Sequence, residues 1–589
     1  MKLGKFDLEN SAVPAWRNYH SVKVVAALPR SVWLGGLFII FATLVAYWPA
    51  FSAGFIWDDD FFVTQNLALR DLSGLRQIWF NIHATLQYYP IVHTVFWVEY
   101  HLWGLQPLGF HAVNVLLHIA AALLLWRILA RLELPWAWLA AAIFALHPVQ
   151  VESVAWVTEL KNVLSSVFYF AAALCYLRFA RLDKAIGNDR WRGHFYFGAL
   201  ILFVAALLSK TVTCSLPAAL MLILWWKKER LHRRDVYPLA PFFLVGIGLG
   251  LASAWFEQHE VGAQGAEWSL TFAERSLIAG RAVWFYAAKL FWPAQLTFIY
   301  PRWEIDARLW WQWMFPLAAV IVVAALWLAR RRIGKGFLTA VLFFGGTVLP
   351  ALGFANVYPM RFSFVADHFQ YLAGIGIIVV GTGLAVKFFE TCQADRRLQT
   401  SLAALLLLVL GVLTWQQCHI YKDLETLWTD TLKKNPRCWM AHSNLGRLLV
   451  QQGKLDEAEA HYQAALAVHP AEETIHYNYA NQLVKTGRLE DGVAQYRQAL
   501  QLAPEKPETH CNLGFALNQQ HRTDEAIAEY ERAIYYKPDF AEAYYNLGNA
   551  LSSGKKMEAA IAAYQRAVRL KPDSELFKKR LQALGAPAG

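Results

Sequence analysis

The C-terminal part of the chain repeats with a strict period of 34 residues. Prolines recur at this spacing at Pro436, Pro470, Pro504, Pro538 and Pro572. Asparagines keep the same spacing at Asn444, Asn478, Asn512 and Asn546. A repeat of this length is one small unit that cannot bury its own apolar face, so successive units must stack on one another. The period therefore predicts an elongated array of repeats instead of a globular domain.

Each period also carries the pattern of two amphipathic helices that cross. A small residue marks the crossing, a tyrosine packs against it and an alanine follows, as in Gly514, Tyr530 and Ala533. A helix pair of this length is typical of tetratricopeptide (TPR) repeats. We expect four TPR repeats over residues 435–575, which form a soluble α-solenoid with a concave groove, and a C-terminal capping tail at 576–589.

The repeated asparagines Asn444, Asn478, Asn512 and Asn546 are candidate peptide-binding residues. An asparagine amide offers both a donor and an acceptor, which suits the backbone of an extended acceptor polypeptide. The alternative is that asparagine is simply an ordinary structural residue at this position of the repeat.

Before the repeats the chain is strongly apolar. The whole chain is 57% hydrophobic and only 17% charged, which places a protein of this length in a lipid bilayer. A helix needs about 20 apolar residues to span the bilayer. Eleven candidate spans occur, at residues 32–51, 110–130, 136–157, 162–178, 194–209, 212–226, 238–256, 312–329, 337–355, 369–387 and 400–416. The fold class is therefore all-α, with a polytopic membrane domain at 32–418 and a linker helix at 419–434.

Basic residues between the apolar segments predict the orientation. Clusters such as Lys227-Lys228, Arg330–Arg332 and Arg396-Arg397 belong on the cytoplasmic side. The N-terminal segment 1–31 is then cytoplasmic, the first span is an uncleaved signal anchor, and eleven spans place the repeats outside. Residues 276–298 would break this alternation, so we expect a re-entrant or interfacial segment there. The net charge of +11 belongs to these loops, which argues against nucleic-acid binding.

The acidic triplet Asp58–Asp60 directly follows the first span. Adjacent carboxylates repel one another, which raises the pKa of at least one of them and makes it a candidate general base. The alternative is a solvated loop. Glu152 is a further catalytic candidate, because a carboxylate at the outer end of a span costs roughly 2 to 3 kcal/mol unless it is paired or hydrated. Its alternative is a helix kink that faces interfacial water.

Three cations fall near the outer ends of predicted spans, at Lys161, Lys210 and Arg361. Cations at that depth suit the phosphate of a lipid-linked donor, and snorkelling of long side chains is the alternative. Asp367 and His368 precede a later span and complete the candidate phosphate-binding set, and a structural role is the alternative for the histidine. Six cysteines without paired spacing predict neither a metal site nor a disulfide framework, and the sequence leaves open whether a divalent metal assists.

Several of these residues lie in motifs that resemble the transmembrane and TPR-repeat-containing O-mannosyltransferases and their bacterial relatives. The motifs, in chain order, are Phe55–Asp59, Tyr89-Pro90, Gly109–His118, Leu146–Trp156, Leu208–Thr211 and Ala366–Leu372. The resemblance covers nearly the whole chain and implies a GT-C glycosyltransferase fold. Such an enzyme takes a sugar, here a hexose such as mannose, from a polyprenyl-phosphate donor and passes it to an acceptor outside the cytoplasm.

The resemblance also implies roles for individual residues. Asp58 and Asp59 match the acidic residues that deprotonate the acceptor hydroxyl, and Glu152, Lys210 and Asp367 fall on recurring positions. The sequence departs from the pattern after Asp367, where His368 stands in place of an arginine or similar residue. We expect a protein Ser/Thr acceptor that the TPR groove recruits.

Two other functional classes compete with this interpretation. A non-enzymatic TPR scaffold needs only one span as an anchor, and eleven spans with polar residues at matched depths argue against it. A transporter is disfavoured because the two halves show no inverted repeat of broken helices. We expect a bacterial inner membrane with periplasmic repeats, or else the endoplasmic reticulum membrane with lumenal repeats.

The topology leads to a labelling prediction. A cysteine introduced at Lys555 should react with an impermeant thiol reagent added on the periplasmic or lumenal side, because the repeats lie outside. A cysteine at Arg233 should not react from that side. Labelling of both cysteines from the cytoplasmic side contradicts the arrangement.

Overall fold

The computed structural model describes residues 32–85, 87–182, 191–263, 265 and 268–584. The predicted cytoplasmic segment 1–31 and the end of the predicted tail, 585–589, lie outside these residues. The chain divides into two compact units, Met1–Leu427 and Trp428–Gly589. Helices and loops, and no β-strands, make up the described residues, which confirms the all-α class.

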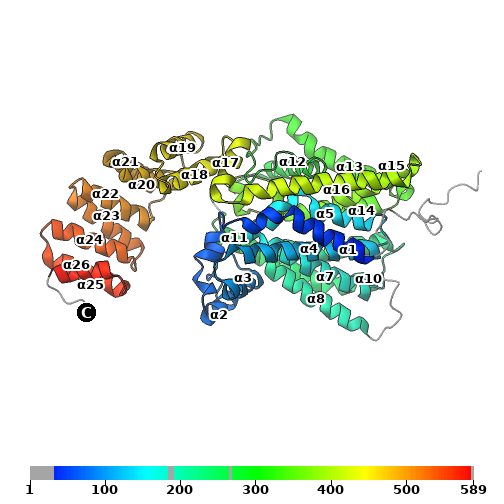
Figure 1. Cartoon of the computed structure of the whole chain (residues 1–589), viewed down its shortest axis with the longest axis horizontal. Helices are drawn as coiled ribbons and strands as arrows, with labels where there is room; N and C mark the ends of the chain where they lie inside the picture. Colours follow the sequence, from blue (N-terminus) through cyan, green and yellow to red (C-terminus); the bar gives the residue numbers. More distant parts are fainter. Residues whose placement is uncertain (1–31, 86, 183–190, 264, 266–267, 585–589) are drawn as a thin grey trace, which may run out of the picture. The chain divides into compact units, whose positions relative to one another are not determined.

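The first unit is built from a set of long apolar helices. Several of them run side by side, as Figure 1 shows for α1, α4, α5 and α16. The apolar helices, which differ in length, are α1 (Val32–Ala46), α4 (Pro107–Arg131), α5 (Ala137–Leu146), α7 (Leu160–Phe179), α8 (Arg192–Ser209), α9 (Leu216–Lys227), α11 (Ala240–His259), α13 (Met314–Ile333), α14 (Gly336–Val348), α15 (Gly374–Thr391) and α16 (Arg396–Cys418). Shorter or less apolar helices lie between them, at α2 (Leu72–Phe80), α3 (Pro90–Trp103), α6 (Val151–Ala155), α10 (Arg233–Val236) and α12 (Phe272–Phe291).

Within the described residues, 7 helices are long and apolar enough to cross a membrane. Helices Ala137–Leu146 and Pro148–Ala155 make an eighth candidate if they form one span, bent by 54° where Pro148 interrupts the helix. Three shorter apolar helices, at Val32–Ala46, Thr211–Lys227 and Gly336–Ala351, fall on the remaining predicted spans. Together these helices coincide with the predicted apolar segments.

The ambiguous segment 276–298 forms most of helix α12. The helix begins with a capping box, in which Thr271 and Glu274 each bond the backbone of the other. Charged side chains at Glu274, Arg275, Arg281 and Lys289 distinguish it from the apolar helices, and it is not among the span candidates. Its position relative to the membrane stays a prediction.

The apolar helices alternate in direction along the chain, so their connections gather at two ends. One end holds the connections that carry the candidate site residues. These are the loop with Asp58, the turn between α6 and α7, Lys210 between α8 and α9, and Asp367 ahead of α15. The basic clusters that follow α9 and α13 fall at the other end. The fold thereby separates the candidate site residues from the predicted cytoplasmic charges.

The second unit consists of stacked helix pairs. Helix α17 (Leu424–Lys434) spans the division between the units. The pairs are α18 (Trp439–Gln451) with α19 (Leu455–Val468), α20 (Glu473–Lys485) with α21 (Leu489–Leu502), α22 (Pro507–Gln519) with α23 (Thr523–Tyr536), and α24 (Ala541–Ser553) with α25 (Met557–Leu570), followed by α26 (Glu575–Ala583).

The repeated small residues explain how each pair closes. A Cβ added to Gly514 would lie 2.9 Å from the ring of Tyr530, and one on Gly548 would lie 2.8 Å from the ring of Tyr564. Real Cβ atoms do not approach a ring that closely, so glycine lets the two helices cross at this distance. Both tyrosines are buried. The crossing pattern predicted from the sequence is therefore present.

Candidate active site

The loop after α1 is fixed by Asp59. Its Oδ2 accepts a hydrogen bond from the backbone N–H of Ile56 at 2.8 Å. Its Oδ1 accepts from the backbone N–H of Thr158 at 2.8 Å and from the Thr158 hydroxyl at 2.5 Å. The side chain is fully buried, and burial raises the pKa of Asp59 to about 7 although these donors lower it. Asp59 therefore fastens the loop after α1 to the segment that precedes α7.

Asp58 has different surroundings, although it is the next residue. The backbone bends sharply before it, because Trp57 adopts a left-handed conformation with φ 46°. Asp58 is partly exposed. Burial raises the pKa of Asp58 to about 6, while the nearby Lys161 ammonium lowers the pKa and the Glu159 carboxylate raises it. Asp58 is thus a carboxylate with a raised pKa that lies near a charged cluster.

The third acid of the triplet, Asp60, forms its hydrogen bond within its own helical turn. The Asp60 carboxylate accepts a hydrogen bond from the hydroxyl of Thr64 at 2.9 Å, within the same short helical turn. The three adjacent acids therefore have three different environments, which the sequence pattern did not distinguish.

The charged cluster centres on Glu159, a residue that the sequence analysis missed. Its two oxygens pair with two ammonium groups, Oε1 with Lys161 at 3.0 Å and Oε2 with Lys210 at 3.2 Å. Asn162 also donates to Oε2 at 2.5 Å. Glu159 is almost fully buried, and both lysines are largely buried. An acid in an apolar stretch, two residues before a lysine, is the signal that could have identified it.

Lys161 also contacts aromatic rings. Its ammonium lies 5.3 Å from the centre of the Phe62 ring and 6.0 Å from that of Trp156. Phe62 belongs to the turn that Asp60 begins. Cation–π contacts of this kind hold a partly desolvated ammonium in place. The loop after α1 therefore contacts the charged cluster through Phe62, and Asp59 bonds Thr158, which directly precedes Glu159.

A second pair joins Glu152 to the segment ahead of α15. The Glu152 carboxylate accepts a hydrogen bond from the backbone N–H of His368 at 3.1 Å and lies 3.0 Å from its Nδ1. The side-chain amide of Asn162 donates to the carbonyl of His368 at 3.2 Å. Asn162 thus contacts both the Glu159 cluster and the Glu152–His368 pair. The two groups form one continuous polar network.

Asp367 lies beside this network. The hydroxyl of Tyr300 donates to its two oxygens at 3.0 and 3.1 Å. Burial raises the pKa of Asp367 well above its usual value, and the Glu152 carboxylate raises it further. Asp367 is therefore suited to a structural or proton-holding role more than to carrying a permanent charge beside a phosphate.

The structure thus brings together seven of the eight membrane-domain residues that the sequence pointed to. Each of the seven belongs to the polar network described above or lies next to it. They are Asp58, Asp59, Glu152, Lys161, Lys210, Asp367 and His368. The eighth, Arg361, lies half-buried on the short helical turn Tyr358–Arg361 ahead of Asp367. In the described residues, no group of three or more His, Cys, Asp or Glu side chains could hold a metal ion.

The four repeated asparagines are not equivalent. The Asn444 amide donates to the Met440 carbonyl of its own helix at 2.8 Å. Asn512 donates to the hydroxyl of Tyr477 at 3.1 Å and to Asn481 at 3.0 Å, and Asn546 lies within hydrogen-bond distance of the Cys511 sulfur at 3.5 Å. Two of the four therefore bridge to the preceding repeat.

The second unit matches a known family of repeats. Residues 425–473, 444–507, 477–538 and 511–575 match the tetratricopeptide repeat family model, which confirms the repeat prediction. Among solved structures, the crystal structure of MamA resembles the chain with a TM-score of 0.24 at 18% identity, over 25% of this chain and 86% of that one.

The curated relatives extend over the membrane unit. The chain is 22% identical to protein O-mannosyl-transferase F38B6.6 of Caenorhabditis elegans, over 74% of this chain and 63% of that protein. It is 24% identical to protein O-mannosyl-transferase Tmtc3 of Drosophila melanogaster, over 75% of this chain and 56% of that protein. It is also 24% identical to protein O-mannosyl-transferase TMTC4 of Mus musculus, over 72% of this chain and 65% of that protein. These homologues confirm the resemblance drawn from the motifs, and the chain spans less than two thirds of the length of each.

The contacts of Asp59 lead to a stability prediction. Asp59→Asn exchanges one acceptor oxygen for a donor, so at least one buried N–H group loses its partner, at a cost of about 1 to 3 kcal/mol. Thermal unfolding of the purified full chain should show a lower midpoint than for the wild type. Asp60→Asn is the matched control, because Asp60 bonds only within its own turn. Equal midpoints for the two variants would contradict the clamping role of Asp59.

Proposed function

We propose that the chain is a membrane glycosyltransferase of the GT-C type. It moves a hexose such as mannose from a polyprenyl-phosphate donor to a Ser/Thr hydroxyl of a protein acceptor. The observation that carries the proposal is the position of the Asp58 carboxylate, whose pKa is raised to about 6, near Lys161, which shares the Glu159 carboxylate with Lys210. The names of the homologous protein O-mannosyl-transferases support the same reaction class.

Asp58 is the proposed general base. It accepts the proton of the acceptor hydroxyl as the hydroxyl oxygen forms its bond to C1 of the sugar. Asp59 is less suited to this step, because its two oxygens already accept three hydrogen bonds and its side chain is fully buried. The bond from C1 to the phosphate oxygen breaks on the opposite side, so the reaction inverts the anomeric centre. The polyprenyl phosphate leaves with the electron pair.

Lys161 and Lys210 form the proposed phosphate site. The two ammonium groups share the Glu159 carboxylate, so each of them can also bind an anionic phosphate. The negative charge of that phosphate grows as the sugar departs. Preorganised cations stabilise such developing charge most strongly where water is excluded. Arg361 belongs to the same proposal from its turn ahead of Asp367.

Glu152, Asp367 and His368 are proposed to position this site. Glu152 holds the backbone and ring of His368, and Asn162 ties the same residue to Glu159. A movement of the segment around His368 would therefore shift Glu159 and the phosphate site through these hydrogen bonds. The proposed reaction uses no metal ion. Assays of sugar transfer with and without a chelator test whether a divalent metal also binds the departing phosphate.

The TPR groove is proposed to recruit the acceptor polypeptide, from a position outside the cytoplasm. Asn478 is the strongest ligand candidate among the four asparagines. Its amide makes no side-chain hydrogen bond with the described residues, whereas the other three amides contact protein atoms. It is also only half-buried. A peptide backbone offers the donor and acceptor that such an amide lacks.

The base assignment predicts a rate loss and a pH profile. Asp58→Asn should reduce sugar transfer to an acceptor peptide by about 10²- to 10⁴-fold, because the amide cannot accept the proton. In the wild-type enzyme kcat/KM should fall about tenfold per pH unit below pH 6, where the Asp58 carboxylate is protonated. Asp60→Asn is the matched control and should keep most activity. Full activity of the Asp58→Asn variant would refute the assignment.

The groove proposal predicts a separate kinetic effect. Asn478→Ala should raise KM for a protein acceptor while kcat and the hydrolysis of donor by water stay unchanged, because only acceptor binding is affected. Asn444→Ala is the control, since that amide bonds its own helix. If both reactions fell equally in the Asn478 variant, the residue would serve folding and not recognition.

A further inference from the structure

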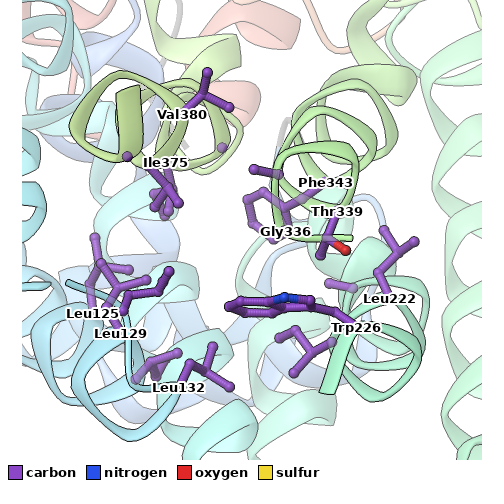
Figure 2. Close-up of a pocket in the computed structure, with 18 of the residues that line it drawn as sticks. Leu125, Leu129, Leu132, Leu222, Trp226, Gly336, Thr339, Phe343, Ile375 and Val380 are labelled. Carbon is purple, nitrogen blue, oxygen red and sulfur yellow. The ribbon is translucent and has the colours of Figure 1, made fainter. Parts of the chain in front are cut away.

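A cavity of about 640 Å³ lies in the membrane unit, away from the network around Glu159. Helices α4, α7, α9, α14 and α15 contribute its walls, and no residue of the candidate active site lines it. In Figure 2, Leu125, Leu129 and Leu132 lie across the hollow from Phe343 and Thr339, with the Trp226 ring between the two sides. The volume lies within the range of sites that bind small molecules.

The charged groups of this cavity are confined to one end, whereas the Tyr169 hydroxyl lies midway along α7. Lys227 ends α9, Lys387 lies in the last turns of α15, and Thr339 lies one turn inside the start of α14. Each of these positions is near the helix end that carries the basic clusters. Elsewhere the lining is mostly Leu, Ile, Val, Phe and Ala. The cavity therefore grades from charged at its mouth to apolar at its inner part.

The charged side chains at this end of the cavity are held in place, and the positive ones outnumber the negative ones. The Lys227 ammonium donates to the Leu132 carbonyl and lies 4.1 Å from the centre of the Trp226 ring. The Lys387 ammonium lies 5.0 Å from the centre of the Phe337 ring. Glu133 is the one acid among the residues that line the cavity, so two ammonium groups face one carboxylate.

Thr339 supplies an independent sign of a ligand. Its hydroxyl is buried, and among the described residues it has no hydrogen-bond partner. Buried hydroxyls almost always have a partner, because an unsatisfied one carries a desolvation cost. A ligand with an acceptor oxygen about one helical turn below its charged group would satisfy it.

We propose that this cavity binds an anionic glycerophospholipid from the leaflet at the basic end of the helices. The phosphate lies between Lys227 and Lys387, an ester carbonyl accepts from Thr339, and an acyl chain lies against the leucines of α4. Apolar walls of this kind hold hydrocarbon in preference to water. The inference depends on the helices spanning the membrane and is independent of the transferase reaction.

The donor lipid is a poorer occupant. Its phosphate must reach the Lys161–Lys210 site, which lies at the opposite end of the alternating helices. A phosphate at Lys227 and a phosphate at Lys210 are therefore two separate sites. Anionic lipids are enriched in the cytoplasmic leaflet, where basic residues attract them.

The test uses the purified full chain, delipidated in detergent, and measures binding of phosphatidylglycerol and phosphatidylcholine by native mass spectrometry. The wild type should retain one phosphatidylglycerol and prefer it to phosphatidylcholine. Lys227→Gln/Lys387→Gln should weaken phosphatidylglycerol binding by about 25-fold, taking roughly fivefold for each charge near the surface. Arg331→Gln/Arg332→Gln is the matched control, since both arginines are exposed at the same end of α13 and do not line the cavity.

A second variant tests the cavity itself without a change of charge. A Cβ at Gly383 would meet the Phe337 ring at ordinary van der Waals distance, so Gly383→Leu places its branched end in the cavity without backbone strain. This variant should lose bound lipid while its thermal unfolding stays cooperative. Three results would each overturn the proposal. These are equal binding of the two phospholipids, wild-type binding by Gly383→Leu, and retention of polyprenyl phosphate in place of phospholipid.

Discussion

The site of the membrane unit depends on one carboxylate that holds two ammonium groups. Glu159 is buried between Lys161, in the first turn of α7, and Lys210, which directly follows α8. Charges taken out of water are costly unless their partners and hydrogen bonds are complete, and removal of one partner typically costs about 3 to 5 kcal/mol. Asn162 adds a hydrogen bond to the same carboxylate. The loops between α6 and α7 and between α8 and α9 are therefore fixed by the same interaction that sets the local charge.

The acidic triplet shows how neighbours, and not residue type, assign a role. Asp59 accepts three hydrogen bonds and fastens two loops, Asp60 bonds within its own turn, and Asp58 faces Lys161. A clamp needs its oxygens occupied, whereas a base needs one oxygen open to its substrate. Because Asp59 is fixed by its hydrogen bonds, it also holds the neighbouring Asp58, the proposed base, beside the charged cluster. This arrangement is the physical basis for preferring Asp58 over Asp59.

Sequence patterns predicted what depends on local periodicity. The spacing of Pro504 and Pro538 specified the helix pairs, and runs of apolar residues specified the membrane helices. Pairings between distant segments had no such signal. Glu152 meets His368 across more than two hundred residues, which no spacing within one helix encodes. The asparagines illustrate the same limit, because whether Asn512 bonds Tyr477 or a ligand depends on the register between neighbouring repeats.

The joining of both units in one chain has a consequence for the proposed reaction. A groove that holds an extended polypeptide by backbone contacts binds each segment weakly, since ordering a flexible chain opposes binding. Linking the groove to the membrane unit turns the encounter of acceptor and Asp58 into an intramolecular event, with an effective concentration that can reach the millimolar range. The site around Glu159 then needs only to recognise a hydroxyl and a lipid phosphate, and its few polar groups suffice for that. Under this proposal, the repeats select the acceptor and the membrane unit carries out the chemistry.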